Sequence, residues 1–178
     1  MTLEYNFGHR LRVVVMGVSG CGKSSVGAAL ADALGLSYLE GDSLHPDENI
    51  EKMMQGVPLT DDDRWPWLDE IGEKLRNAPP PGLIASCSAL KKSYRTRLRA
   101  SAGDPLYFVY LHARRETLIE RMQMRTGHFM PVSMLDSQLA ALEPPLGEQD
   151  VVAVNVNQSL ESVIKYAAAE LKEIMRPS

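Results

Sequence analysis

The sequence has few cysteines, no excess of positive charge and no long apolar run. Only Cys21 and Cys87 occur in 178 residues, so we expect free thiols in a reducing compartment rather than a disulfide framework. The net charge of −4 argues against a nucleic-acid-binding protein, which usually carries a basic face. No segment approaches the roughly 20 apolar residues of a membrane-spanning helix. The N-terminal MTLEYNFGHRLR lacks the apolar core of a secretory signal. These absences predict a cytoplasmic protein without nucleic-acid or membrane partners.

The length and the hydrophobic pattern predict one α/β domain spanning residues 1–178. Apolar residues make up 44% of the chain and charged residues 24%, which is an ordinary globular balance. Short β-rich runs alternate with helical patterns. The first, LRVVVMG, is β-branched and uninterrupted, as expected for a strand that is buried on both faces. Five such runs predict a parallel sheet flanked by helices, with strands at 11–17, 36–40, 83–88, 105–111 and 150–156.

The helix that follows TDDD is constrained by a proline. Pro66 is tolerated best in the first turn of a helix, so we expect this helix to start near Asp62 or Asp63. Its buried stripe is expected to consist of Leu68, Ile71 and Leu75. Methionines also recur at helical spacings, which favours a core-filling role for positions 53, 54, 122, 124 and 134.

The strongest motif lies directly after the first expected strand. Residues 17–24 read GVSGCGKS and match G-x-x-x-x-G-K-[ST] at every fixed position. Glycines let the backbone N–H groups wrap around phosphate oxygens, and the following helix points its positive end at the same anion. Lys23 can reach the β- and γ-phosphates, and the Ser24 hydroxyl can ligate Mg²⁺. The sequence therefore predicts binding of ATP or GTP by Gly17, Val18, Ser19, Gly20, Cys21, Gly22, Lys23, Ser24 and Ser25.

Two motifs of other nucleotide enzymes are missing. There is no N-K-x-D to read guanine, which argues against a GTPase. The strand at 83–88 ends in serines and a cysteine rather than in the aspartate of a Walker B motif. Mg²⁺ would therefore depend on Ser24, the phosphates and water, with Glu40 or Asp42 acting through that water.

A dense polar cluster, LEGDSLHP, follows the second expected strand. Ionisable groups placed so closely at a strand end cost stability unless they are paired or functional. From the residues alone, Asp42 could equally cap a turn, and His45 could equally be a structural histidine.

Six segments of the chain together resemble the gluconate kinase family. They are MGVSGCGKSSVG, GDSLHP, NIEKMMQGVPLTDDDRWPWL, CSALKKSYR, GHFMP and LDSQLAALEPP, and the resemblance runs from about residue 13 to 165. The P-loop is shared by many families, whereas the other blocks are narrower signals. The resemblance implies a three-layer P-loop kinase fold with a five-stranded parallel sheet, similar to nucleoside monophosphate kinases and shikimate kinase. It also implies a substrate-binding region at about 42–78, a short mobile lid at about 121–136, and Mg²⁺–ATP-dependent phosphorylation of D-gluconate to 6-phosphogluconate.

The resemblance implies roles for individual residues. Asp42 becomes the candidate general base for the terminal hydroxyl of gluconate, on a strand expected to neighbour the P-loop strand. His45 would bind other hydroxyls, and Arg64 would bind the carboxylate, although a solvated surface charge is its ordinary interpretation. Lys91 and Arg95 would face the substrate or the transferring phosphate.

The expected lid contributes the remaining candidates. Arg121 and Arg125 would cover the phosphates when the lid closes, with Arg121 in a catalytic role. His128 would approach the substrate on closing, and Gln138 would face the site. The alternatives left open are a shikimate or nucleoside monophosphate kinase, and a nucleotide-dependent regulatory switch. A homodimer is compatible with the sequence.

Overall fold

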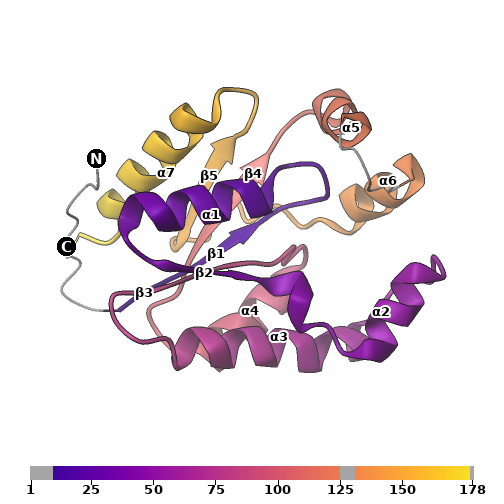
Figure 1. Ribbon diagram of the computed structural model, residues 1–178, viewed down its shortest axis with the longest axis horizontal. Helices are drawn as coiled ribbons and strands as arrows, with labels where there is room; N and C mark the ends of the chain where they lie inside the picture. Colours follow the sequence, from indigo (N-terminus) through magenta and orange to yellow (C-terminus); the bar gives the residue numbers. More distant parts are fainter. Residues whose placement is uncertain (1–9, 125–130, 177–178) are drawn as a thin grey trace.

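The computed structural model describes residues 10–124 and 131–176, and its centre is a parallel sheet (Figure 1). The strands are β1 (Leu11–Met16), β2 (Ser37–Glu40), β3 (Gly82–Ser86), β4 (Tyr107–His112) and β5 (Val151–Asn155). They are ordered β2-β3-β1-β4-β5, and all pairings are parallel. The five predicted strands are therefore confirmed. The expectation that the second strand neighbours the P-loop strand was wrong, because β3 lies between β2 and β1.

Helices cover both faces of this sheet. They are α1 (Lys23–Leu34), α2 (Asp47–Met54), α3 (Asp61–Arg76), α4 (Lys92–Ala102), α5 (Arg115–Gln123), α6 (Val132–Ala141) and α7 (Leu160–Ile174), with a short 3₁₀ helix η1 (Gly41–Leu44) after β2. Figure 1 shows α1 and α7 on one face and α3 and α4 on the other. The predicted three-layer fold is confirmed.

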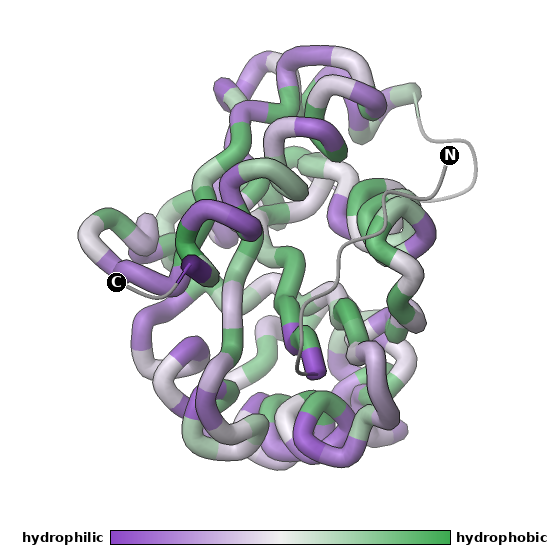
Figure 2. Tube along the Cα trace, turned by 90° about the vertical axis from the view of Figure 1, so that its left-hand side faces the viewer, coloured by the Kyte–Doolittle hydropathy of each residue, from purple (hydrophilic) through white to green (hydrophobic). Residues whose placement is uncertain are grey.

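The two faces of β1 bury different halves of the core. Val13 and Val15 pack into the cluster that includes α1 and α7, whereas Val14 and Met16 pack into the cluster that includes α3 and α4. All four side chains are 0% exposed. Side chains alternate across a strand, so an uninterrupted apolar run supplies both clusters at once. Figure 2 shows the hydrophobic residues running along the strands in the interior.

Helix α3 begins earlier than its proline suggested. Thr60 caps it: the Thr60 hydroxyl accepts from the backbone N–H of Asp63, and the Asp63 carboxylate accepts from the backbone N–H of Thr60. This capping box sets Asp61 as the first helical residue and leaves Pro66 inside the helix, beyond the first turn. The helix starts one residue before the predicted Asp62, and the expectation that Pro66 lies in its first turn was wrong, since the cap rather than the proline sets the start. The predicted buried stripe of Leu68, Ile71 and Leu75 is confirmed.

The methionines were assigned to the core too broadly. Met54 and Met124 are 83% and 82% exposed, and Met53 is also exposed. Met122 is half-buried against the α1–α7 side of the core, and Met134 is also partly buried. Within the described residues, no helix is long and apolar enough to cross a membrane.

Candidate active site

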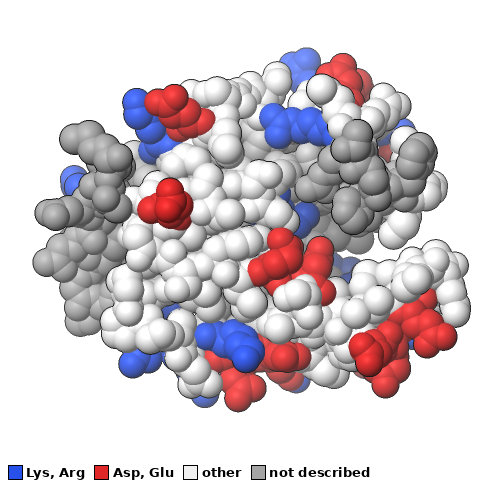
Figure 3. Space-filling view, viewed as in Figure 1, with Lys and Arg blue, Asp and Glu red and all other residues white. Residues whose placement is uncertain are grey.

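Most of the predicted site residues gather at the carboxyl ends of the strands. In a parallel sheet these ends share one edge, and ligands bind in the crevice outside it. The P-loop follows β1, η1 follows β2, and Lys91 lies just beyond β3. The charges of Asp42, Lys23 and Arg64 all act on the buried thiol of Cys87, directly after β3. Figure 3 shows acidic side chains gathered over η1.

The P-loop has the backbone that a phosphate cradle requires. Gly22 caps α1 in the left-handed conformation, with φ of 86°. A Cβ on Gly17 would lie 2.6 Å from the Leu111 carbonyl oxygen, so only glycine fits there. The Lys23 ammonium donates to the Val18 carbonyl across the loop at 3.2 Å. Cys21 is fully buried, so its side chain is not a reactive surface thiol.

The carboxylate of Glu40 is held by three hydroxyl groups. Ser24 Oγ and Tyr38 Oη donate to Oε2 at 2.6 and 2.8 Å, and Ser86 Oγ donates to Oε1 at 2.8 Å. Burial alone would raise the pKa of Glu40, but these hydrogen bonds and the charge of Lys23 outweigh it and lower the pKa. The result is an ionised carboxylate in direct contact with the predicted Mg²⁺ ligand Ser24.

The segment after Glu40 turns sharply against β3. A Cβ on Gly41 would lie 1.8 Å from the Ser86 carbonyl oxygen, so glycine is required at this step. The chain then places Asp42 in η1 with an exposed side chain. His45 instead is buried, and its ring stacks on Trp67 with centroids 4.0 Å apart. Asp42 and His45 therefore share one short segment but differ in access to solvent.

Two predicted cations meet around a tyrosine. The Arg64 guanidinium and the Lys91 ammonium lie 5.4 and 5.6 Å from the ring centroid of Tyr94. The Tyr94 hydroxyl donates to the carboxylate of Asp61, which also lies 3.5 Å from Lys91 Nζ and 3.9 Å from Arg64 Nη1. Burial raises the pKa of Tyr94 to about 12, and the hydrogen bond to Asp61 acts in the same direction. The N-terminal ends of α3 and α4 thus form one cationic cluster.

Arg95 does not join that cluster. Its side chain is 1% exposed, and its five N–H donors go to Glu148, to the carbonyls of Ala89 and Leu90, and to the carbonyl of Glu143. No donor is left for a ligand. The structure therefore corrects the expectation that Arg95 faces the substrate: this residue anchors the segment after α6 to α4.

Two lid candidates contact the nucleotide side of the site. Arg121 on α5 donates to the Val156 carbonyl, and its Nη1 lies 3.7 Å from where a Cβ on Gly22 would stand. Gln138 on α6 accepts from the backbone N–H of Ser19 at 2.8 Å. It therefore lies against the P-loop, whereas the sequence pointed to the substrate. Arg125 and His128 lie outside the described residues.

Several residues of this site were missed by sequence reasoning. Tyr38 and Ser86 bind Glu40, Tyr94 contacts both cations, and Asn49 and Trp67 contact His45. The sequence spacing could have indicated two of these residues. Asn49 follows His45 by one helical turn, and Tyr94 follows Lys91 by one helical turn, so each could lie beside a predicted site residue.

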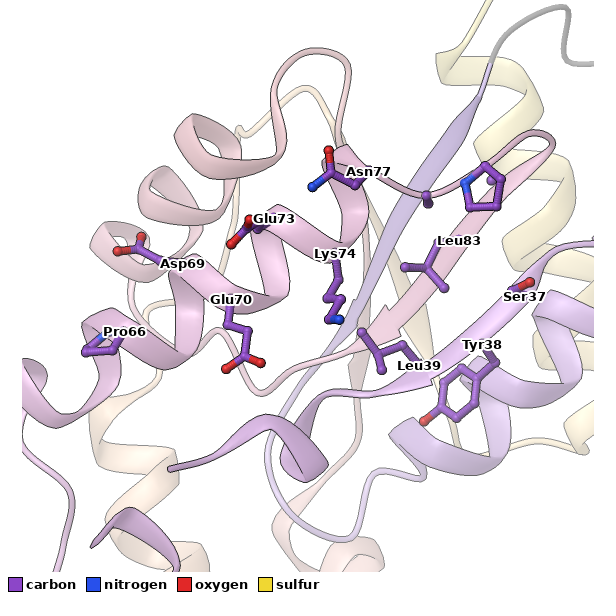
Figure 4. Close-up of a pocket in the computed structure, with 13 residues that line it drawn as sticks. Ser37, Tyr38, Leu39, Pro66, Asp69, Glu70, Glu73, Lys74, Asn77 and Leu83 are labelled. Atoms are coloured by element: carbon purple, nitrogen blue, oxygen red, sulfur yellow. The ribbon is translucent and has the colours of Figure 1, made fainter. Parts of the chain in front are cut away.

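A separate hollow shares only Tyr38 with these residues. It has a volume of about 760 Å³ and is bordered by α3 on one side and by β2 and β3 on the other (Figure 4). Leu39 and Leu83 contribute apolar surface, and Glu70 and Lys74 contribute charges. None of the predicted site residues lines it, so it is not the candidate active site.

The parallel sheet and the glycine-rich loop between β1 and α1 place the chain in the P-loop class of nucleotide-binding proteins. A family model described as an AAA domain matches residues 13–145. The thermosensitive gluconokinase of Escherichia coli (strain K12) is 45% identical over 155 residues, which are 84% of this chain and 81% of that protein. The gluconokinase of Gluconobacter oxydans (strain 621H) is 46% identical, covering 89% of this chain and 92% of that protein.

A solved structure agrees with these relatives. The crystal structure of a gluconokinase from Sinorhizobium meliloti 1021 superposes with a TM-score of 0.86 and 55% sequence identity, and the match covers 93% of each chain. The chain belongs to the gluconokinase family. The family resemblance drawn from the sequence blocks is thereby confirmed.

Proposed function

We propose that this protein transfers the γ-phosphoryl group of ATP to D-gluconate and releases 6-phospho-D-gluconate. The observation that carries the proposal is the pairing of two neighbouring sites at one sheet edge. One is the P-loop with Lys23, and the other is the exposed carboxylate of Asp42 together with the Arg64–Lys91 cluster. The names of the relatives support gluconate as the acceptor.

Each residue contributes a distinct step to this reaction. Lys23 would neutralise charge on the β- and γ-phosphates. Asp42 would accept the proton of the terminal hydroxyl as its oxygen attacks the phosphorus. Arg64 and Lys91 would bind the carboxylate at the other end of the acceptor, which fixes the chain and aims the hydroxyl. Arg121 and Arg125 would add positive charge on the nucleotide side as a lid at about 121–136 closes, and His128 would approach the substrate on closing.

The residues present fit Mg²⁺ as the metal of this reaction. Mg²⁺ prefers oxygen ligands and keeps several waters when it is bound with substrate phosphates. The Ser24 hydroxyl would bind the ion directly, and the Glu40 carboxylate would hold one of its waters. When bound, the ion neutralises charge on the phosphate oxygens. In the described ranges no group of three or more acidic, histidine or cysteine side chains forms a metal site by itself, so the nucleotide would supply the other ligands.

The cationic cluster weighs against the alternative functions. A regulatory switch needs no acceptor site beside its nucleotide, whereas Arg64 and Lys91 both lie against Tyr94 at the sheet edge where acceptors bind. Nucleoside monophosphates and shikimate also carry anionic groups, so they remain the competing acceptors for the experiment below.

We further propose a single cytoplasmic domain over residues 1–178, with a substrate-binding region at about 42–78. We also propose that the protein forms a homodimer, which light scattering would test.

The test is a measurement of ADP release from Mg²⁺–ATP against a panel of acceptors. The panel contains gluconate, related sugar acids, shikimate and nucleoside monophosphates, and the Lys23→Ala protein is the blank. We expect turnover with gluconate to exceed that with every other class. ADP release that is equal with and without any acceptor would identify an ATPase switch, and preference for another acceptor would replace gluconate.

A further inference from the structure

The imidazole of His45 is fixed by packing and by one polar neighbour. The side chain is 8% exposed, and its ring lies nearly parallel to that of Trp67, with 15° between the planes. Trp67 is itself fixed, because its indole N–H donates to the Gly41 carbonyl at 2.8 Å. The ring of His45 therefore has a set orientation next to Asp42 and η1.

The polar neighbour is Asn49, one turn further along the chain. Asn49 is 3% exposed, and its amide nitrogen lies 2.9 Å from the Asp63 carbonyl oxygen and 3.2 Å from Nδ1 of His45. A backbone carbonyl can only accept hydrogen bonds, so the atom of Asn49 that faces Asp63 must be the NH₂ group rather than the oxygen. The second hydrogen of that NH₂ group then points to Nδ1 of His45.

A donor that faces Nδ1 decides the protonation of the ring. Nδ1 must accept, so it carries a lone pair, and the single proton of a neutral imidazole lies on Nε2. We propose that Asn49 is a positioning residue that locks His45 as the neutral Nε2–H form, so that His45 presents a hydrogen-bond donor to a ligand oxygen. This inference rests on the proposed function for the identity of the ligand, a hydroxyl or carboxylate oxygen of gluconate.

The Nε2–H form of His45 gives His45 and Asp42 different roles. Nε2 has no lone pair in this form, so His45 cannot take the proton of the acceptor hydroxyl. The base is then the exposed carboxylate of Asp42. The electrostatic surroundings agree with a neutral ring: burial lowers the pKa of His45, the charge of Arg64 acts in the same direction, and only Asp42 opposes them. Lys52 and the carboxylate of Asp63 pair with each other beside Asn49 and so present little net charge to the ring.

The direct test is nitrogen NMR of histidine labelled with ¹⁵N in both ring positions. The chain has four histidines, and the His45 signals are those lost in His45→Gln. We expect a pyridine-like Nδ1 and a pyrrole-like Nε2 at neutral pH. In Asn49→Asp, whose carboxylate can only accept, the proton should move to Nδ1 or the ring should become cationic. In Asn49→Ala, both tautomers should be populated. A wild-type ring that carries its proton on Nδ1, or tautomers unchanged in both variants, would overturn the proposal.

The second arm uses gluconate-dependent kinetics on the same preparations. Because the donor form of the ring is then only partly populated and less fixed, the KM for gluconate should rise about two- to fivefold in Asn49→Ala while kcat changes little. The matched control is Glu48→Gln, an exposed neighbour on α2, which should leave both constants unchanged. An unchanged KM in Asn49→Ala with an altered tautomer would refute the role in ligand binding. If the wild-type protein does not phosphorylate gluconate but the NMR result stands, the proposed function fails and the tautomer lock survives.

Discussion

The Glu40 carboxylate accepts a 2.6 Å hydrogen bond from the hydroxyl of Ser24, which joins the end of β2 to the first turn of α1. Glu40 is the last residue of β2, whereas Ser24 lies in α1, which follows β1, and β3 separates β2 from β1 in the sheet. Ser86 at the end of β3 completes the bridge by donating to the same carboxylate at 2.8 Å. The ends of β2 and β3 and the start of α1 are thereby held together around one negative charge next to the predicted Mg²⁺ ligand.

Glu40→Gln should weaken the use of Mg²⁺. The amide removes the negative charge and turns one acceptor into a donor that faces Ser24, so the hydroxyl loses its orientation. We expect the apparent affinity for Mg²⁺ to fall about 10- to 100-fold, as for other groups that support a metal ligand. A titration of ADP release against Mg²⁺ measures this, with Tyr38→Phe as the milder control that keeps the charge. A superimposable Mg²⁺ curve for Glu40→Gln would contradict the role.

Gly41→Ala should destabilise the protein through a direct clash. The new Cβ would lie 1.8 Å from the Ser86 carbonyl oxygen, and the Gly41 N–H donates to Ser86 Oγ, so the two segments are already held together at this point. We expect a loss of about 1–3 kcal/mol in the free energy of unfolding, measured by denaturant titration. Gly56→Ala measures backbone strain without a clash, because its φ is +72° and nothing lies within 4 Å of its new Cβ. Gly41 has no positive φ, so a Gly41→Ala protein as stable as the wild type would show that the clash contributes nothing.

Arg95 and Lys91 should respond oppositely to mutation. Arg95→Met breaks a buried ion pair with Glu148, so we expect a loss of roughly 3 kcal/mol of stability, with Arg99 still pairing with Glu148 and limiting the damage. Lys91→Met should leave the melting temperature nearly unchanged and raise the KM for gluconate, because Lys91 is half-exposed. Thermal melting and acceptor kinetics on both variants test this. A stable Arg95→Met protein with a raised KM would restore the original expectation for Arg95.

Local patterns predicted most of the fold but not its long-range partners. The P-loop glycines and the β-branched run of β1 each act within a few residues, so the sequence was sufficient for them. The burial of Arg95 depends on Glu148, which lies 53 positions away, and the motif around Arg95 does not contain that information. Strand order likewise depends on how the crossovers pack, so the position of β3 between β2 and β1 could not be predicted from β2 itself.

The same limit applies to side-chain access within a motif. GDSLHP indicated that Asp42 and His45 both serve the site, but the stacking of His45 on Trp67 brings in a residue from α3. The exposed Met53 and Met54 show the opposite case, because α2 has helical spacing of apolar residues without a neighbour to cover them. Periodicity identifies a helix face, and only tertiary packing decides whether that face is buried.

The lowered pKa of His45 predicts a dependence of stability on pH. Burial is the main cause of the lowered pKa. Because the pKa is lower in the folded protein, the unfolded chain binds more protons at any pH between the folded-state pKa and the ordinary value of 6.5. Stability contributed by the neutral ring is therefore complete above 6.5 and declines as the pH falls toward the folded pKa. From about pH 7.5 to about pH 5.5, wild-type protein should lose more unfolding free energy than His45→Gln. If the unfolding free energies of wild type and His45→Gln changed in parallel with pH, the pKa of His45 would not be lowered by folding.

Asp42→Asn separates a general base from a turn residue. The amide keeps the size and much of the hydrogen bonding but cannot accept a proton, so turnover with gluconate should fall by roughly two to four powers of ten. Nucleotide binding at the P-loop should change little, since Asp42 lies in η1 rather than in that loop. The side chain is exposed and makes no cap to η1, so the melting temperature should also change little.

The two interpretations of Asp42 therefore differ in one variant. If Asp42 only stabilised the turn, asparagine would replace it at a cost of about a few tenths of a kcal/mol, and gluconate-dependent ADP release would continue. Turnover, ATP-analogue binding and melting are measured on the same preparation, with Asp47→Asn on exposed α2 as the matched control. Because His45 holds its proton on Nε2, it cannot substitute as the base, and the loss of activity should persist across the pH range in which the protein stays folded.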